Sequence, residues 1–297
     1  MSTPLRPRLF DLARLKRSFG RAASGYAEVA VLQREVESRL LEQLAVLEEK
    51  KPARILDIGS GPGRASAAMK KRWPGADVIA LDLALPMLRE VPRQTRFWRP
   101  VKRVCAEASQ LPFADASIDV IFSSLCLQWV PDLPVALAEF RRVLRPQGLL
   151  LFSTFGPDTL LELREAYLAA GERQPPLSPF AAIQQVGDAL IAAGFRNPVL
   201  ERDLFTLTYA DVRGLLQELR AIGAGDARVQ RPRGLGGKAR HAGMVQAYEG
   251  QRRDGVLPSS WEVITATAWA PDAGAPRREG SADIASFPAD RIPVRRR

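Results

Sequence analysis

Histidine and cysteine are almost missing from this 297-residue chain, and their scarcity excludes several kinds of site. The single histidine, His241, lies in a basic, glycine-rich stretch, which is typical of a surface residue. Metal sites built from imidazole ligands and nucleophilic triads that depend on histidine are therefore not expected, and we predict no metal site. Cys105 and Cys126 lie in apolar, strand-like stretches, which predicts reduced core thiols rather than a disulfide.

Long apolar runs are missing as well. No stretch approaches the ~18 residues of a membrane-spanning helix, and the basic N-terminus lacks the apolar centre of a secretory signal. The N-terminus has weak features of a transit peptide, but Asp11 and the shortage of serine argue against one. We therefore expect a cytoplasmic protein without a membrane partner.

Aromatic residues are few where the positive charge is concentrated. The net charge of +10 gathers in the N-terminal segment up to Arg21, at residues 228–240 and at residues 295–297. A surface for nucleic acid would interleave aromatic side chains with the basic ones for base stacking, so we expect no nucleic-acid partner. Two interpretations stay open, a solvated basic surface and a surface for an acidic macromolecule.

The apolar patterns that are present predict an α/β fold. Helical periodicity covers residues 8–20 and 26–48. Strand-like and helical stretches then alternate, which predicts a seven-stranded, mostly parallel sheet with helices on both faces. The expected strands are 53–58, 77–82, 101–105, 118–123, 148–155, 199–208 and 262–269. The expected helices among them are 63–73, 85–90, 132–144, 157–171, one that ends at 193–194, and 212–222.

These patterns divide the chain into three parts. Residues 1–50 form a helical extension, and residues 51–270 form a Rossmann-like domain with a lid-like helical insertion at about 157–194. A glycine- and arginine-rich loop is expected at 223–243. Residues 271–297 have almost nothing to bury, so we expect a disordered tail there.

The sharpest motif is the glycine-rich turn after the first expected strand, which reads D-I-G-S-G-P-G-R over residues 57–64. Gly59, Gly61 and Gly63 allow a tight turn and a close approach of ligand to backbone, and the following helix directs free N–H groups at the ligand. A dinucleotide fingerprint would place its third glycine at Arg64. Asp57 would repel a diphosphate but attract the ammonium and sulfonium groups of S-adenosylmethionine. The motif therefore favours S-adenosylmethionine.

Further motifs follow in register along the sheet. Asp82 ends the second strand, where an acidic side chain can bind ribose hydroxyls. NAD sites have an acid at the same position, so Asp82 alone does not distinguish the two cofactors. E-A-S-Q-L-P-F follows the third strand at 107–113, and D-V-I-F-S-S forms the fourth at 119–124. In order and spacing this run resembles the class I S-adenosylmethionine-dependent methyltransferases. The resemblance implies that fold, S-adenosylhomocysteine as product, Ser124 at the cofactor and Glu107, where Asp is commoner, on the adenine amino group.

The flanking segments resemble one family more closely, the malonyl-acyl carrier protein O-methyltransferases of biotin synthesis. The resemblance covers about residues 8–270 and departs at Pro146-Gln147-Gly148, where Gly-Gly is usual. It is carried by F-G-R-A-A-S-G-Y at 19–26, L-C-L-Q-W at 125–129, R-R-V-L-R-P at 141–146, S-T-F-G-P-D-T at 153–159 and W-E-V-I at 261–264. It implies methyl transfer to the free carboxylate of a malonyl thioester, giving the methyl ester that primes pimeloyl and biotin synthesis.

The implied chemistry suits a chain with so little histidine. A malonyl carboxylate, with a pKa of roughly 4, is ionised at neutral pH, so no general base is required and positioning dominates. By resemblance Tyr26 lies over the active site on the N-terminal extension, although it could instead pack a helix against the core. Trp129 could form a wall of the pocket or belong to the core.

The implied partner is an acyl carrier protein, which is acidic. The basic 228–240 segment, with Arg231, Arg233 and Lys238, and the N-terminal helix up to Arg21 are candidate docking surfaces. Many arginines could orient the substrate carboxylate, and the sequence does not select one. The alternatives are a small-molecule methyltransferase of the quinone type, a methyltransferase-fold assembly factor or hydroxylase, and an adenosyl-ligand-binding module. The F-x-R-A-A-x-x-Y segment at 19–26 argues against the quinone type.

Overall fold

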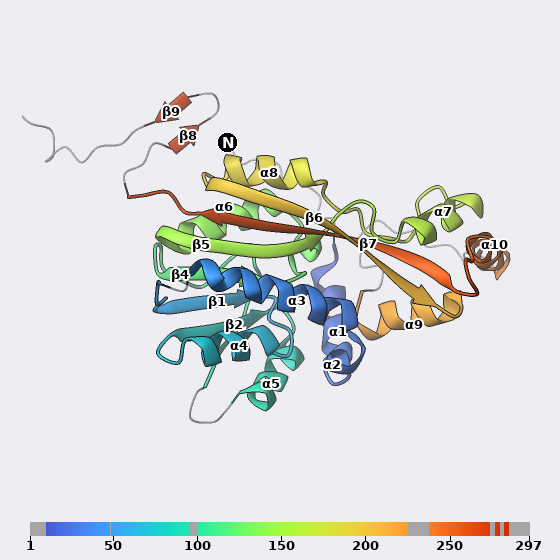
Figure 1. The fold of residues 1–297 in the computed structure, drawn as a ribbon, viewed down its shortest axis with the longest axis horizontal. Helices are drawn as coiled ribbons and strands as arrows, with labels where there is room; N and C mark the ends of the chain where they lie inside the picture. Colours follow the sequence, from blue (N-terminus) through green and yellow to red (C-terminus); the bar gives the residue numbers. More distant parts are fainter. Residues whose placement is uncertain are drawn as a thin grey trace, which may run out of the picture.

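A single seven-stranded sheet with strand order β3-β2-β1-β4-β5-β7-β6 forms the centre of the molecule (Figure 1). The structure is a computed structural model and describes residues 10–47, 49–95, 100–224, 238–273, 277–279 and 282–284. The strands are β1 (Arg54–Ile58), β2 (Asp77–Asp82), β3 (Lys102–Cys105), β4 (Ile118–Ser123), β5 (Leu144–Phe155), β6 (Arg196–Tyr209) and β7 (Leu257–Trp269). β1 to β5 pair in parallel, and β7 runs antiparallel to both β5 and β6. This topology confirms the predicted Rossmann-like α/β fold with a mostly parallel seven-stranded sheet.

Alternating side chains of the strands pack on opposite faces of the sheet, as the pleat requires. In β1, Ile55 belongs to the apolar cluster beneath one layer of helices, whereas Leu56 and Ile58 belong to the cluster beneath the other. The first layer is α3 (Val31–Gln43), α4 (Arg64–Arg72) and α5 (Leu85–Gln94), and the second is α6 (Leu133–Val143) and α8 (Ile183–Ala192). The chain thus forms three layers, with ligand sites expected at the carboxyl ends of β1 and β4, where the strand order reverses.

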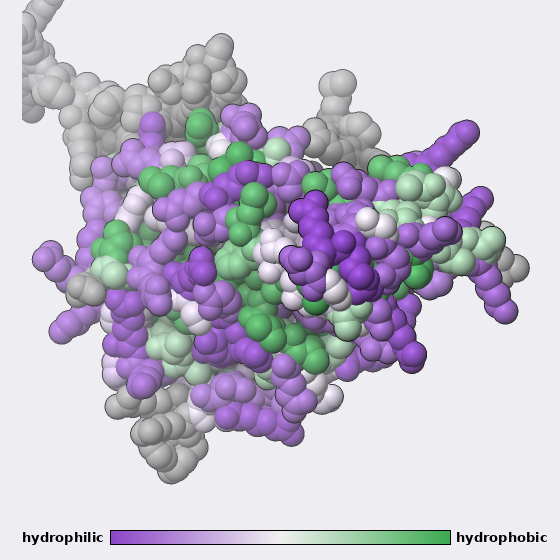
Figure 2. Space-filling view, turned by 45° about the vertical axis from the view of Figure 1, so that its right-hand side comes forward, coloured by the Kyte–Doolittle hydropathy of each residue, from purple (hydrophilic) through white to green (hydrophobic). Residues whose placement is uncertain are grey.

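A third apolar cluster lies at one end of the molecule, where β6 and β7 extend beyond the other strands (Figure 1). α7 (Leu161–Ala169), α9 (Val212–Ala221) and α10 (Lys238–Glu249) pack there, around Leu215, Tyr248 and Trp261. The N-terminal α1 (Leu12–Ala22) and α2 (Tyr26–Val29) lie between this cluster and α5. Hydrophilic residues cover most of the face in Figure 2, with smaller hydrophobic areas between them.

Most expected elements are present, but several differ for identifiable reasons. The helix expected at 26–48 is broken at Ala30, and its last turn is a 3₁₀ turn, Leu44–Leu47. The loop expected at 223–243 is wrong from Lys238 on, because α10 buries Met244 and Tyr248 one helical turn apart. β5 begins at Leu144, earlier than expected.

The expectation of core thiols is also wrong for Cys105, whose side chain is exposed because β3 is the edge strand of the sheet. Cys126 is half-buried, and both cysteines are free. In the tail, β8 (Arg277–Glu279) and β9 (Ala282–Ile284) pair with each other, and the other residues from 274 on lie outside the described ranges, so tail disorder stays a prediction. None of the helices in the described ranges has the length and hydropathy to span a membrane.

Candidate active site at the carboxyl ends of the strands

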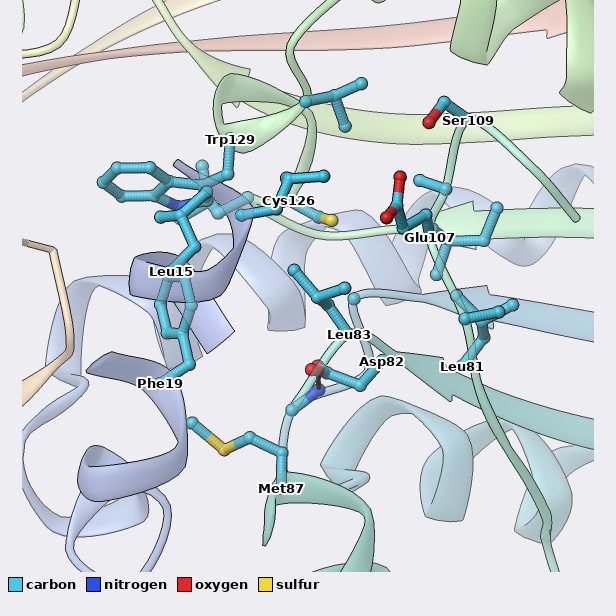
Figure 3. Close-up of a pocket in the computed structure, with 18 of the residues that line it drawn as sticks. Leu15, Phe19, Leu81, Asp82, Leu83, Met87, Glu107, Ser109, Cys126 and Trp129 are labelled. Atoms are coloured by element: carbon cyan, nitrogen blue, oxygen red, sulfur yellow. Dashed lines mark hydrogen bonds between the residues drawn. The ribbon is translucent and has the colours of Figure 1, made fainter. Parts of the chain in front are cut away.

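A hollow lies at the carboxyl ends of β1, β2, β3 and β4, and α1 closes one side of it (Figure 3). One wall, to the right in Figure 3, comes from the segment after β3, which carries Glu107. The opposite wall comes from Leu15 and Phe19 of α1 together with Trp129 after β4. The floor is the glycine turn after β1 and the end of β2. The hollow therefore lies where the strand order reverses, as expected for a nucleotide site in this fold.

The backbone conformation of the glycine turn favours glycine at all three positions, and two of the three also lack space for a side chain. Gly59, Gly61 and Gly63 have φ angles of +70°, +53° and +87°, which side chains rarely adopt. A Cβ at Gly59 would lie 2.4 Å from the Cβ of Cys126, and one at Gly63 would lie 2.8 Å from Val91. A Cβ at Gly61 would meet nothing within 4 Å. The Gly61 backbone thus faces open space at the hollow.

Asp82 ties the glycine turn to the end of β2. Its carboxylate accepts hydrogen bonds from the backbone N–H groups of Gly61, at 2.9 Å, and Ala84, at 2.7 Å. Burial raises the pKa of Asp82 to about 6, although both backbone hydrogen bonds favour the charged form. The structure places Asp82 in the hollow, together with the sequence-predicted Glu107, Ser124 and Trp129.

Asp57 lies elsewhere than the sequence suggests. It shares the strand face of Ile55 and points toward α4, where it accepts a 2.5 Å hydrogen bond from the Ser66 hydroxyl. It is only 2% exposed and does not line the hollow. Burial raises the pKa of Asp57 to about 7 against the opposing effect of the Ser66 hydrogen bond. The structure therefore shows Asp57 bracing α4, with no direct approach to the hollow.

A second hollow adjoins the first around the same glycine turn, and both share Tyr26, Gly59, Gly61 and Ser124. Its other wall is the polar side of α3, with Gln33 and Glu37. The Gln33 Oε1 and Ser60 Oγ atoms are buried here and have no hydrogen-bond partner among the described residues. Unpartnered buried polar atoms are costly unless a ligand or water completes them. This hollow therefore has the character of a site for a polar group.

Gln33, Ser60 and Glu37 were not predicted from the sequence, although the sequence carries a signal for two of them. Gln33 and Glu37 are spaced i, i+4 on α3 and lie along one side of its apolar stripe of Leu32, Val36 and Leu40. Glu37 also forms a 2.7 Å ion pair with Arg64 at the start of α4, and burial raises the pKa of Glu37 to about 6. The polar residues of the predicted helix thus indicated the site, whereas its apolar stripe indicated only the side that packs on the core.

Tyr26 lies at the junction of the two hollows, at the first residue of α2. Burial, and then the negative charges of Glu37 and Asp82, raise the pKa of Tyr26, so its hydroxyl stays protonated at neutral pH and can donate a hydrogen bond. Trp129 packs edge-on against Phe19, with ring centroids 5.6 Å apart. The N-terminal extension therefore closes the site with both a polar and an aromatic contact.

Lysine and arginine side chains are distributed unevenly between the two hollows. The described residues that line the first hollow include no lysine or arginine, whereas Arg34 and Arg64 line the second. Arg21 and Lys238 are exposed, on α1 and at the start of α10, and Arg231 and Arg233 lie outside the described residues. Within the same ranges, no cluster of histidine, cysteine, aspartate or glutamate is suited to a metal ion.

The raised pKa of Asp57 predicts a pH dependence of stability. The folded pKa of about 7 lies above the reference value of 3.8, so between these values the native state binds the proton and the unfolded state does not. The stabilising contribution of Asp57 is therefore complete below about pH 3.8, and it is lost progressively as the pH rises from there to about 7. Asp57→Asn should flatten the fall in unfolding free energy between these pH values, measured by urea denaturation. Asp188→Asn, at an exposed position of α8, is the matched control, and equal slopes for all three proteins would contradict the prediction.

Comparison with known proteins agrees with this geometry. Residues 56–152 match the family model for a methyltransferase domain. The chain is 55% identical to the malonyl-[acyl-carrier protein] O-methyltransferase of Xylella fastidiosa (strain M23), over 97% of this chain and 98% of that protein. It is 44% identical to the protein of the same name from Gallionella capsiferriformans (strain ES-2), over 93% and 96% of the two chains. The fold matches that of a candidate methyltransferase from Bacillus halodurans C-125 with a TM-score of 0.57, at 18% identity over 79% of this chain and 99% of that one.

Proposed function

Because the chain belongs to the malonyl-[acyl-carrier protein] O-methyltransferase family, we propose that it methylates the free carboxylate of a malonyl thioester on an acyl carrier protein. The methyl donor is S-adenosylmethionine, and S-adenosylhomocysteine is released. The observation that carries the proposal is the pair of joined hollows around Gly61, one holding unpartnered polar atoms and the other walled by α1. We place the reaction in the cytoplasm, and its methyl ester product would prime pimeloyl and biotin synthesis.

The residues around the glycine turn fit the polar groups of this cofactor. Asp82 suits the ribose hydroxyls, and Glu107 can accept from the adenine amino group. Gln33 and Ser60, whose buried oxygens have no partner among the described residues, suit the amino-acid end. When bound, S-adenosylmethionine supplies a methyl group that its sulfonium activates. Asp57 would act on this site only through Ser66 and the position of α4.

The substrate side of the site is suited to holding a carboxylate without neutralising it. A malonyl carboxylate is ionised at neutral pH, so no residue has to remove a proton and no metal ion is needed. Among the described residues, the first hollow offers this group neutral donors and no cation, and the Tyr26 hydroxyl is the donor that we assign to it. A tight ion pair with arginine would lower the nucleophilicity of the carboxylate. Leu12, Leu15 and Phe19 of α1 exclude water from the same space.

The direct test uses the purified protein with methyl-labelled S-adenosylmethionine and malonyl-acyl carrier protein. We expect label in a base-labile methyl ester on the carrier protein. Acetyl-acyl carrier protein, which lacks the free carboxylate, is the matched control and should stay unlabelled. Labelled quinone or protein arginine would favour the alternative activities, and cofactor binding without any product would favour a binding module.

A further inference from the structure

α1 has two faces of opposite character. Leu12, Leu15 and Phe19 line the hollow. Arg14, Arg17 and Arg21 recur at i, i+3 and i+7 and lie on the opposite side of the helix, because each turn takes 3.6 residues. Arg17 and Arg21 are exposed, Arg14 is half-buried, and α1 contains no acidic residue. One helix thus joins the wall of the site to a basic outer surface.

The cations of this surface are available for a partner. The Arg14, Arg17 and Arg21 side chains form no hydrogen bond or ion pair with the residues that the structure describes. Elsewhere arginines are matched with acids inside the molecule, as for Arg142 with Glu139, at 2.8 Å, and Arg202 with Glu262, at 2.5 Å. Cations without internal partners produce a field that attracts and orients an acidic protein.

Packing fixes the direction of this surface. Gly20 approaches Pro86 of α5 so closely that a Cβ there would lie 3.3 Å from the proline ring. On the other side, Phe19 lies against Gly223 after α9, where a Cβ would lie 2.8 Å from the phenylalanine ring. α1 is therefore held between α5 and the end of α9, with its apolar face on the hollow and its arginines outward. Since the apolar face is already covered, α1 does not have a free hydrophobic side to insert into a lipid surface.

We propose that the outer face of α1, formed by Arg14, Arg17 and Arg21, is the docking surface for the acidic acyl carrier protein. The inference rests on the proposed function. A carrier protein bound here would hold its thioester arm beside the hollow that the inner face of the same helix lines. Docking and closure of the site would then depend on a single element, which explains why α1 is both strongly amphipathic and basic.

The test compares two substrates that share the malonyl thioester but differ in the carrier. Arg17→Glu/Arg21→Glu should raise KM for malonyl-acyl carrier protein about ten-fold at low ionic strength. Turnover of malonyl-N-acetylcysteamine, which has neither protein nor phosphate, should stay within about two-fold, because its contacts are confined to the hollow. Added salt should raise KM of the native enzyme for the carrier protein and reduce the difference between native and variant. Arg17→Gln/Arg21→Gln should give an intermediate increase.

The matched control is Lys51→Glu/Lys71→Glu, which makes the same change in charge at two exposed positions, before β1 and in the last turn of α4. Both positions lie at the amino ends of the parallel strands, whereas the hollow lies at their carboxyl ends. It should leave both substrates unaffected. Unchanged KM for the carrier protein in Arg17→Glu/Arg21→Glu would overturn the proposal, as would equal losses on both substrates, which would mean a structural role. Arginine-dependent binding to phosphatidylglycerol-containing vesicles with unchanged KM would also overturn it. Absence of methyl ester from malonyl-acyl carrier protein with the native protein would instead refute the proposed function.

Discussion

Replacing Gly61 with alanine is expected to weaken the binding of S-adenosylhomocysteine by at least about a hundredfold, equivalent to about 2.7 kcal/mol, while the protein stays folded. The added methyl group would meet no protein atom within 4 Å and would instead project into the space between the two hollows. The left-handed φ of +53° adds strain of about 1 kcal/mol. Isothermal titration calorimetry and thermal unfolding together separate the loss of affinity from the loss of stability.

Two other glycines make this experiment specific. Gly255 has a φ of +82° and no neighbour within 4 Å of its would-be Cβ, but lies before β7, away from the hollows, so Gly255→Ala should lose similar stability and no affinity. Gly59→Ala would bring its Cβ to 2.4 Å from Cys126 and should destabilise the fold itself by about 1–3 kcal/mol. If Gly61→Ala binds the nucleotide as tightly as the native protein, the cofactor does not lie along this turn.

Tyr26→Phe is expected to lower kcat about a hundredfold and to change the dissociation constant of S-adenosylhomocysteine by less than about threefold. The substitution keeps the ring that lies between the two hollows and removes only the hydroxyl, which is protonated at neutral pH. We assign that hydroxyl to the orientation of the substrate carboxylate, so its loss should act on turnover and spare cofactor binding. Initial rates with malonyl-acyl carrier protein and calorimetric titration measure the two quantities.

Tyr248→Phe is the matched control, because it also removes one phenol hydroxyl. The Tyr248 hydroxyl donates a 2.7 Å hydrogen bond to the Pro258 carbonyl in the cluster around α10, and Tyr248 lines neither hollow. Its loss should lower the unfolding free energy by about 1 kcal/mol and leave kcat unchanged. Native-like kcat in Tyr26→Phe would show that the Tyr26 hydroxyl does not contact the reacting carboxylate.

The sequence predicted the sheet well because its strands carry their own local signal. Short apolar runs such as 77–82 and 118–123 coincide with β2 and β4, and the glycine turn follows β1 as expected. The signal was weaker where packing overrides local composition. α10 forms through Gly243 because Met244 and Tyr248 are buried against α7, and nothing in the local sequence shows that contact.

Within the site, the sequence determined which residues stand at the strand ends. Asp82, Glu107, Ser124 and Trp129 all reach the hollow, because the carboxyl ends of parallel strands converge on one edge of the sheet. It did not determine the direction of Asp57, which depends on which face of β1 meets α4.

The tertiary structure alone decided which helix faces complete the site. Gln33 and Ser60 line the same hollow because α3 packs across the start of α4. The inner face of α1 becomes a wall because α5 and the end of α9 hold it there. The physical reason is that periodicity along a chain specifies which side of an element is apolar, whereas the surface which that side covers is set by the packing of all the elements together.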